Sequence, residues 1–194
     1  MNNSFGFRKK LILWLSVLTF SLLLTGCLKR SEGGANTRLG MSALEKGDYS
    51  AALAYFDQAS AAMEDPVVLY RGRGIALMGQ ARYDEAAQAF ETALSAADSR
   101  MPKTIRDIRL YQVSNWYRMG EYENVINEAR ELLDEERSAE LYFLLGASFL
   151  ARDDQDSARE NFDQAAAMSS GDYGMYLRIY ECYEQHKLTG IGDI

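Results

Sequence analysis

The sequence has 194 residues, of which 47% are hydrophobic and 25% charged, and only two are proline. This composition favours one all-helical domain over a sheet protein. The formal net charge is −7, and because residues 1–26 hold three basic and no acidic side chains, the remainder carries −10. So acidic a chain excludes nucleic acid as an expected partner, and it excludes a membrane held by surface charge alone.

The first 27 residues have the features of an export signal. A basic run at 8–10 precedes an apolar stretch over 11–24, which is shorter than the ~20 residues that a spanning helix needs. The following Leu24-Thr25-Gly26-Cys27 resembles a bacterial lipobox. The resemblance implies a signal peptide over 1–26 that is removed by cleavage after Gly26, and a diacylglycerol, with acyl chains such as palmitate, attached to the sulfur of Cys27. The alternative is an uncleaved anchor helix in which Cys27 is incidental.

Residues 27–36 are interpreted as the lipidated N-terminus and a flexible tether. Beyond the tether, hydrophobic periodicity predicts helical hairpins. The stretch from 68 to 94 contains two short helices, and residues 80–84 break the period between them. The second of these helices carries an apolar stripe at the i, i+3, i+4, i+7, i+8 spacing of one helical face, made of Ala86, Ala89, Phe90, Ala93 and Leu94.

This hairpin recurs along the chain. Five of its residues have counterparts 34 positions earlier, and four have counterparts 72 positions later, without a change of register. The earlier copy is Gly40, Tyr49, Ala52, Phe56 and Ala59; the later copy is Gly146, Ala158, Phe162 and Ala165. With Tyr70, Gly74, Leu77, Tyr83, Ala86, Phe90 and Ala93 in order, the chain resembles tetratricopeptide-repeat (TPR) proteins, whose helix-turn-helix unit has a 34-residue period.

The resemblance implies an all-α, right-handed α-solenoid of about four hairpins, without a single central core. A TPR domain is expected over residues 37–188, followed by a tail over 189–194. Its parts are repeats at 37–66, 67–100, 106–136 and 139–170, and a capping helix at 172–188.

The third repeat departs from the family pattern. Tyr83 and Tyr122 are 39 positions apart, and either a longer loop or an extended second helix would account for the excess. Val113 stands where glycine is expected and Ala129 where an aromatic residue is expected. The bulky side chain is therefore expected on the first helix of this repeat instead of the second.

The last helical stretch has two interpretations. Tyr176, Ile179, Tyr180 and Tyr183 are expected on one face, with charge on the other. Such a helix suits the terminal cap that a solenoid needs. It also resembles the first helix of a fifth repeat, whose second helix would be missing.

No constellation supports catalysis or a cofactor, so an enzyme is not expected. Cys182 and His186 are four residues apart, but two ligands do not make a zinc site, and a packed cysteine beside a surface histidine is the expected arrangement. Asp153, Asp154 and Asp156 do not fit a calcium loop and are interpreted as a solvated helix start. No metal is therefore expected.

In TPR proteins, the first helices of the repeats form an inner, concave surface, and the resemblance carries this groove over to 12 positions. They are Arg38, Met41, Arg71, Ile75, Met78, Tyr111, Ser114, Tyr117, Arg118, Phe143, Ala147 and Leu150. Tyr and Arg are residue types that anchor interfaces. Some of these side chains, such as Ile75, Ala147 and Leu150, are equally compatible with packing between helices.

Together these features predict a membrane-anchored TPR adaptor that binds an extended or helical segment of another protein. Its expected location is the bacterial cell envelope, on the extracytoplasmic face of the cell membrane. Leu28 after the lipidated cysteine favours the outer membrane if the organism has one. One narrower version is an assembly lipoprotein for pilus or outer-membrane components. The alternative is a self-associating structural protein that uses the tyrosine face of residues 176–183 as a dimer contact.

Overall fold

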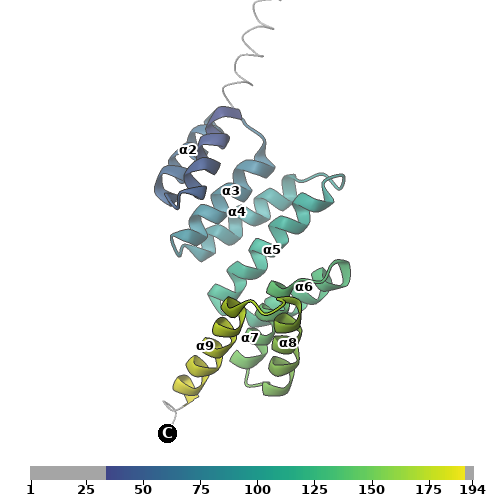
Figure 1. Ribbon diagram of the computed structural model, residues 1–194. Helices are drawn as coiled ribbons and strands as arrows, with labels where there is room; N and C mark the ends of the chain where they lie inside the picture. The colour runs from purple at the N-terminus through teal and green to yellow at the C-terminus, as the bar shows by residue number, and fades with distance from the viewer. Residues whose placement is uncertain (1–33, 191–194) are drawn as a thin grey trace, which may run out of the picture.

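The computed structural model describes residues 34–190, with side chains through 187. Every regular element in this range is an α-helix, which confirms the all-α prediction (Figure 1). A helix over residues 34–45 is followed by α2 (Tyr49–Ala61), α3 (Pro66–Gly79), α4 (Tyr83–Ala96), α5 (Pro102–Met119), α6 (Tyr122–Glu135), α7 (Ala139–Ala151), α8 (Gln155–Met168) and α9 (Tyr173–Gly190).

The predicted signal peptide, Cys27 and most of the tether lie outside the described residues. Residues 34–36, which the sequence assigned to the tether, are helical. The reason is that Glu64 caps this first turn, since its carboxylate accepts the N–H of Thr37 at 3.0 Å. Within residues 34–190, no helix combines the length and apolar character needed to cross a bilayer.

The helices form four successive hairpins, and α9 follows the last of them (Figure 1). Helix 34–45 pairs with α2, α3 with α4, α5 with α6, and α7 with α8. The second helix of each hairpin packs on the first helix of the next, so the array is elongated. Its buried side chains gather in three clusters along the array. This arrangement is the stack of TPR-like hairpins expected from the repeat pattern.

A glycine facing a phenylalanine closes three of the four hairpins. A Cβ atom added to the glycine would lie 2.5 or 2.6 Å from the nearest ring carbon of the phenylalanine. The three pairs are Gly40 with Phe56, Gly74 with Phe90, and Gly146 with Phe162. Because glycine lacks this atom, a buried ring fits between two helices at close approach.

The turns inside the hairpins place one residue each at positive φ. That residue is Gly47 in the first hairpin and Gly120 in the third, with φ of 72° and 80°. Ala81 and Asp153 hold the equivalent positions, with φ of 57° and 62°. The left-handed conformation costs an L-residue about 1–2 kcal/mol, so the second and fourth turns carry strain that glycine would relieve.

Neither expected explanation accounts for most of the longer spacing before the third repeat. The connector 97–101 is one residue longer than the connector 62–65, and α4 has 14 residues against 13 in α2. Most of the excess lies in α5, which has 18 residues where α3 has 14. Val113 and Ala129 are both fully buried, as expected if the bulky side chain has moved to the first helix.

The terminal helix α9 does not continue the stack. Whereas α5 and α7 each contact the preceding second helix more than the preceding first helix, α9 packs more on the first helix α7 than on the second helix α8. The four side chains expected on one face differ in burial. Ile179 and Tyr183 pack against the array, whereas Tyr176 and Tyr180 are 50% and 60% exposed, and Met175 is buried. Residues 189 and 190, assigned to the tail, continue the helix.

Candidate functional site

We name the surface formed by helix 34–45, α3, α5 and α7 the inner face. All 12 predicted groove residues lie on these four helices. The structure divides the inner face into two halves. The half over the first two repeats and the adjoining part of α5 is open to solvent, whereas α9 covers the half over the fourth repeat.

The open half contains a hollow of about 370 Å³ between α3 and α5. Its walls combine three tyrosine rings with aliphatic side chains and one arginine. The lining residues are Tyr49, Ile75, Met78, Gly79, Ala81, Tyr83, Tyr111 and Arg118. Ile75, Met78 and Tyr111 also pack against the central buried cluster, so a rigid core holds their outward surfaces in position.

Arg71 connects α3 to α5 beside this hollow. Its Nε donates to the Oδ2 of Asp107 at 2.5 Å, and its Cζ lies 5.4 Å from the centre of the Tyr111 ring. The Tyr111 ring in turn stacks on Phe90, with 6.1 Å between ring centres. The sequence placed Arg71 and Tyr111 in the groove as ligands of a partner. In the structure they also fix the spacing of two successive first helices.

The remaining predicted residues of the open half differ in availability. Arg38 and Arg118 are exposed. Met41 is partly buried against the first cluster, and the hydroxyl of Ser114 donates to the backbone carbonyl of Leu110 at 3.1 Å. Of the two exposed arginines, Arg118 lines the hollow between α3 and α5, so it is the cationic side chain of that hollow.

The predicted groove residues of α7 are not accessible. Phe143, Ala147 and Leu150 are 5%, 3% and 2% exposed. They are inaccessible because α9 lies over α7. The guanidinium carbon of Arg178 sits 3.9 Å from the centre of the Phe143 ring. Sequence reasoning did not foresee this cover, because periodicity identifies the faces of α9 but not the helix on which one of them packs.

Tyr117 was expected to face the groove but is partly buried near α9. Its ring lies 5.9 Å from that of Tyr122, and it lines a small hollow of about 290 Å³ together with Cys182. Burial raises the pKa of Tyr117 to about 12, with a smaller contribution from the nearby Cys182. Burial likewise raises the pKa of the Cys182 thiol, so this cysteine stays protonated at neutral pH.

The polar residues near the end of α7 have structural roles. Asp154 caps α8 by accepting the N–H of Ser157 at 3.1 Å, and Asp156 pairs with Arg159 at 2.9 Å. These contacts support the interpretation as a helix start. The Nε2 of His186 lies 3.4 Å from the Oδ1 of Asp153. In the described part of the chain, no three histidine, cysteine or acidic side chains gather in a way that could hold a metal ion.

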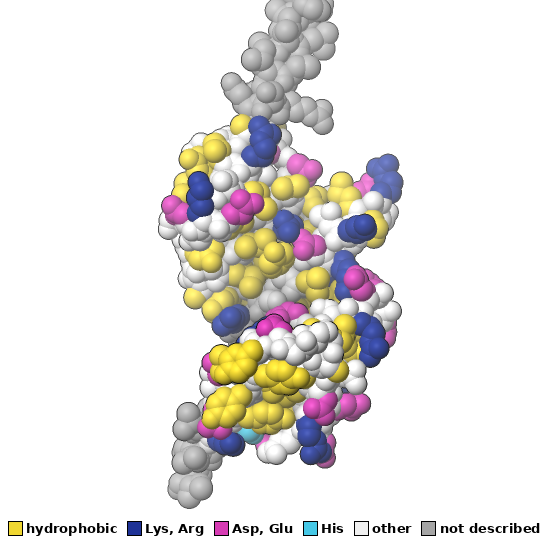
Figure 2. All heavy atoms as spheres, viewed as in Figure 1, with side chains coloured by type: hydrophobic (Ala, Val, Ile, Leu, Met, Phe, Trp, Pro, Cys, Tyr) yellow, Lys and Arg dark blue, Asp and Glu magenta, His cyan; other side chains and the backbone are white. Residues whose placement is uncertain are grey.

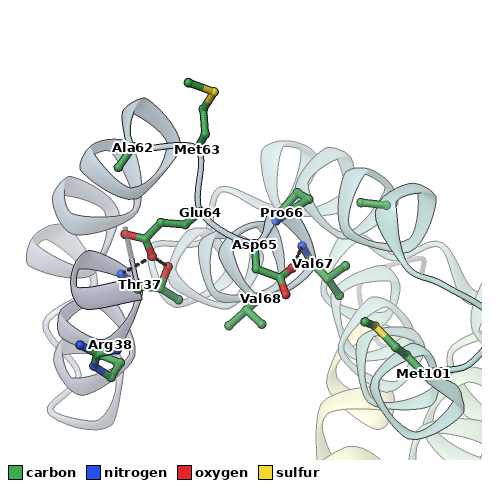
Figure 3. A pocket seen from close by; sticks show the side chains of 12 residues that line it. Thr37, Arg38, Ala62, Met63, Glu64, Asp65, Pro66, Val67, Val68 and Met101 are labelled. Carbon is green, nitrogen blue, oxygen red and sulfur yellow. Dashed lines mark hydrogen bonds between the residues drawn. The ribbon is translucent and has the colours of Figure 1, made fainter. Parts of the chain in front are cut away.

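A larger hollow of about 610 Å³ lies at the edge where helix 34–45 and α3 begin, and the predicted groove residue Arg38 lines it (Figure 3). The other residues that line it were not among the predicted groove residues. Thr37 and Glu64 join two of its walls through the contact drawn in Figure 3, and Met63 and Met101 stand at its rim. Its lining mixes apolar with acidic and basic side chains.

These observations define the class of the protein. Stacked antiparallel hairpins of similar length, closed by glycine–phenylalanine contacts at a recurring spacing, form a TPR-like α-solenoid.

The comparisons with known proteins agree with this class. Residues 37–102 match the family model described as Tetratricopeptide repeat. The solved structure named MamA AMB-1 C2221 is similar in fold, with a TM-score of 0.61 and 18% sequence identity over 81% of this chain and 89% of that chain. No curated protein matches the sequence. Residues 37–102 therefore match the tetratricopeptide repeat, and the stacked hairpins of the described residues are TPR-like.

Proposed function

We propose that this protein is an adaptor that binds a segment of another protein on its inner face while a lipid on Cys27 holds it at a bacterial membrane. The observation that carries the binding part is the open hollow between α3 and α5. Tyrosine rings, Ile75 and Met78 supply an apolar floor, and the exposed Arg118 stands at its rim. Such a combination of aromatic, methionine and arginine side chains is enriched at the centres of protein interfaces.

The charge distribution favours a partner segment that is apolar with an acidic residue. Arg118 offers a cation beside the hollow, whereas Arg71 already pairs with Asp107. A carboxylate next to two or three apolar side chains would therefore match the open half. Many TPR arrays bind extended or helical segments, and both shapes suit a groove of this kind.

The membrane part of the proposal is supported by the sequence. The lipobox at 24–27 ends seven residues before Gly34, where the described helices begin. Fully extended, seven residues span at most about 25 Å, so the array would remain close to the bilayer. The proposed location is the extracytoplasmic face of the cell membrane, or the outer membrane in an organism that has one. An assembly lipoprotein for pilus or outer-membrane components is a narrower version.

Crosslinking in intact cells followed by recovery of the lipidated protein tests the adaptor function. We expect Arg118→Ala to reduce recovery of the crosslinked partner, while Arg159→Ala, which removes an exposed arginine on α8, leaves recovery unchanged. Equal recovery with both variants would refute the assigned surface. Mass spectrometry of the mature N-terminus tests the anchor, and a mature chain that begins elsewhere than Cys27 would refute it.

A second candidate function is self-association. It is favoured by the exposed side chains of α9, since Tyr173, Tyr176, Leu177 and Tyr180 are 42–77% exposed. Figure 2 shows hydrophobic side chains gathered over this part of the molecule, at the lower left. Sedimentation of residues 28–194 over a range of concentrations tests it, and a monomer at every concentration would exclude this function.

A further inference from the structure

The face of α9 that contacts the array has the pattern of a helix bound in a groove. Its inward side chains follow the i, i+3, i+4, i+7, i+8, i+11 spacing of one helical stripe. They are Met175, Arg178, Ile179, Cys182, Tyr183 and His186. Met175 belongs to the same buried cluster as Phe143, Ala147 and Leu150, and Ile179, Cys182 and Tyr183 pack against that cluster.

One arginine gives this contact its chemical specificity. Both terminal nitrogens of Arg178 donate to the two carboxylate oxygens of Glu140, each at 2.7 Å. The Cζ atom of the same guanidinium lies over the Phe143 ring, 3.9 Å from the ring centre. A two-pronged ion pair combined with stacking on an aromatic ring is a recognition geometry that lysine cannot reproduce.

The rest of the contact between α9 and the array is incomplete. A hollow of about 290 Å³ remains under its C-terminal half, between Tyr117, Leu150 and Cys182. The opposite side of the helix is exposed, and the ion pair of Arg178 is itself partly exposed. A connector of four residues, 169–172, joins α9 to α8 and includes Ser170 and Gly171 at positive φ.

We propose that the inner face of the fourth repeat is a second binding surface, that it takes an amphipathic helix of a partner protein, and that α9 occupies it until the partner displaces α9. The partner helix carries an arginine for Glu140 and Phe143, with apolar side chains one, four and five positions after it. This inference rests on the proposed adaptor function, because it extends the groove from the open half to the covered half.

The thiol of Cys182 on α9 can report the displacement of α9 from this surface. A chain of residues 28–194 contains all the residues of the contact between α9 and the array. The only thiol in this chain is that of Cys182. We expect Arg178→Glu, and separately Glu140→Arg, to raise the native-state rate of Cys182 modification by a maleimide by at least about tenfold, and the double variant to restore it, as paired residues do in a double-mutant cycle.

A synthetic peptide of residues 172–190 with a fluorescent label tests the surface itself. We expect the peptide to bind the Arg178→Glu chain at least about tenfold more tightly than the unsubstituted chain, because the tethered α9 competes with it in the latter. A peptide that carries Arg178→Glu is the matched control and should not bind. Circular dichroism and thermal melting show whether each variant is folded.

Three results would overturn the inference. They are an unchanged modification rate in both single variants, modification that requires global unfolding, and equal binding of the two peptides to the Arg178→Glu chain. Any of these would make α9 a fixed cap. The adaptor function would still stand in that case, because its test depends on Arg118 and on recovery of a partner from cells.

Discussion

The contact between Gly74 and Phe90 gives the most direct test of how the hairpins are held together. In Gly74→Ala, the added Cβ would lie 2.5 Å from a ring carbon of Phe90, and Phe90 is fully buried, so its ring has little room to move. Overpacking by one methyl group costs about 1–3 kcal/mol, and we expect about 2–3 kcal/mol at this site because the Phe90 ring is fully enclosed. The better helix propensity of alanine offsets about 1 kcal/mol of this cost. We therefore expect a net loss of about 1–2 kcal/mol in the free energy of unfolding.

Urea denaturation followed by circular dichroism measures this loss, and a loss of about 1–2 kcal/mol lowers the thermal midpoint by roughly 2–8 °C in a chain of this size. Gly174→Ala is the control, since its Cβ would meet only the side chain of Asp172, at 3.2 Å. Phe90→Leu should relieve the clash, so that the double variant with Gly74→Ala loses less stability than the sum of the two single losses. Strictly additive losses, or a stable Gly74→Ala, would refute the packing argument, and Gly74→Leu should disrupt the hairpin altogether.

Three further predictions concern other parts of the array. Ala81→Gly relieves the positive φ of Ala81 and should stabilise the chain by about 1 kcal/mol, whereas Gly120→Ala should destabilise it by a similar amount; urea midpoints that move in the opposite directions would contradict this. Because burial raises the pKa of Tyr117 to about 12, folding stability should be intact below pH 10 and fall as the pH rises towards 12, and Tyr117→Phe should reduce that fall in alkaline unfolding curves. Tyr117→Ala should lower the free energy of unfolding by about 2 kcal/mol because the ring packs against the largest cluster. Replacing the exposed Arg118 by alanine should lower it by less than about 0.5 kcal/mol. Equal melting temperatures of the two variants would show that Tyr117 is not packed.

Because α9 covers one half of the inner face, substitutions in the open half and in the covered half test different properties. A substitution at Arg118 probes partner contacts alone, since this side chain is exposed. A substitution at Leu150 or Phe143 removes buried packing under α9 and would lower stability whether or not a partner binds there. Binding data for the covered half must therefore be read together with the thermal melting of each variant.

The third hairpin departs from the repeat pattern, and ion pairs join its two helices. Arg109 of α5 contacts Glu128, Glu131 and Glu135 of α6, and hydrogen bonding to Glu128 is the largest cause that raises the pKa of Arg109. Arg109 of the longer helix α5 thus contacts three glutamates that lie along one side of α6. These polar contacts add to the buried contact of Val113, which stands where the other hairpins have their glycine.

The sequence by itself determined the repeating part of this protein. The 34-residue spacing of glycine, alanine and phenylalanine predicted the hairpins, and the structure confirms them because each hairpin is decided by contacts between residues close in the chain. Local rules also explain the solvated helix start at Asp154, which needs only the N–H of Ser157 three residues later. The first helices on which the predicted groove residues lie follow from the same spacing.

Only the tertiary structure decided which of those residues are accessible and where the last helix lies. The side chains of α9 allow two apolar faces, Tyr176 with Tyr180 or Met175 with Cys182, and periodicity does not rank them. The choice depends on contacts with Glu140 and Phe143, more than 30 residues earlier in the chain. Such contacts between distant residues leave no periodic trace in a single sequence, so the covered half of the groove could not be recognised before the fold was known.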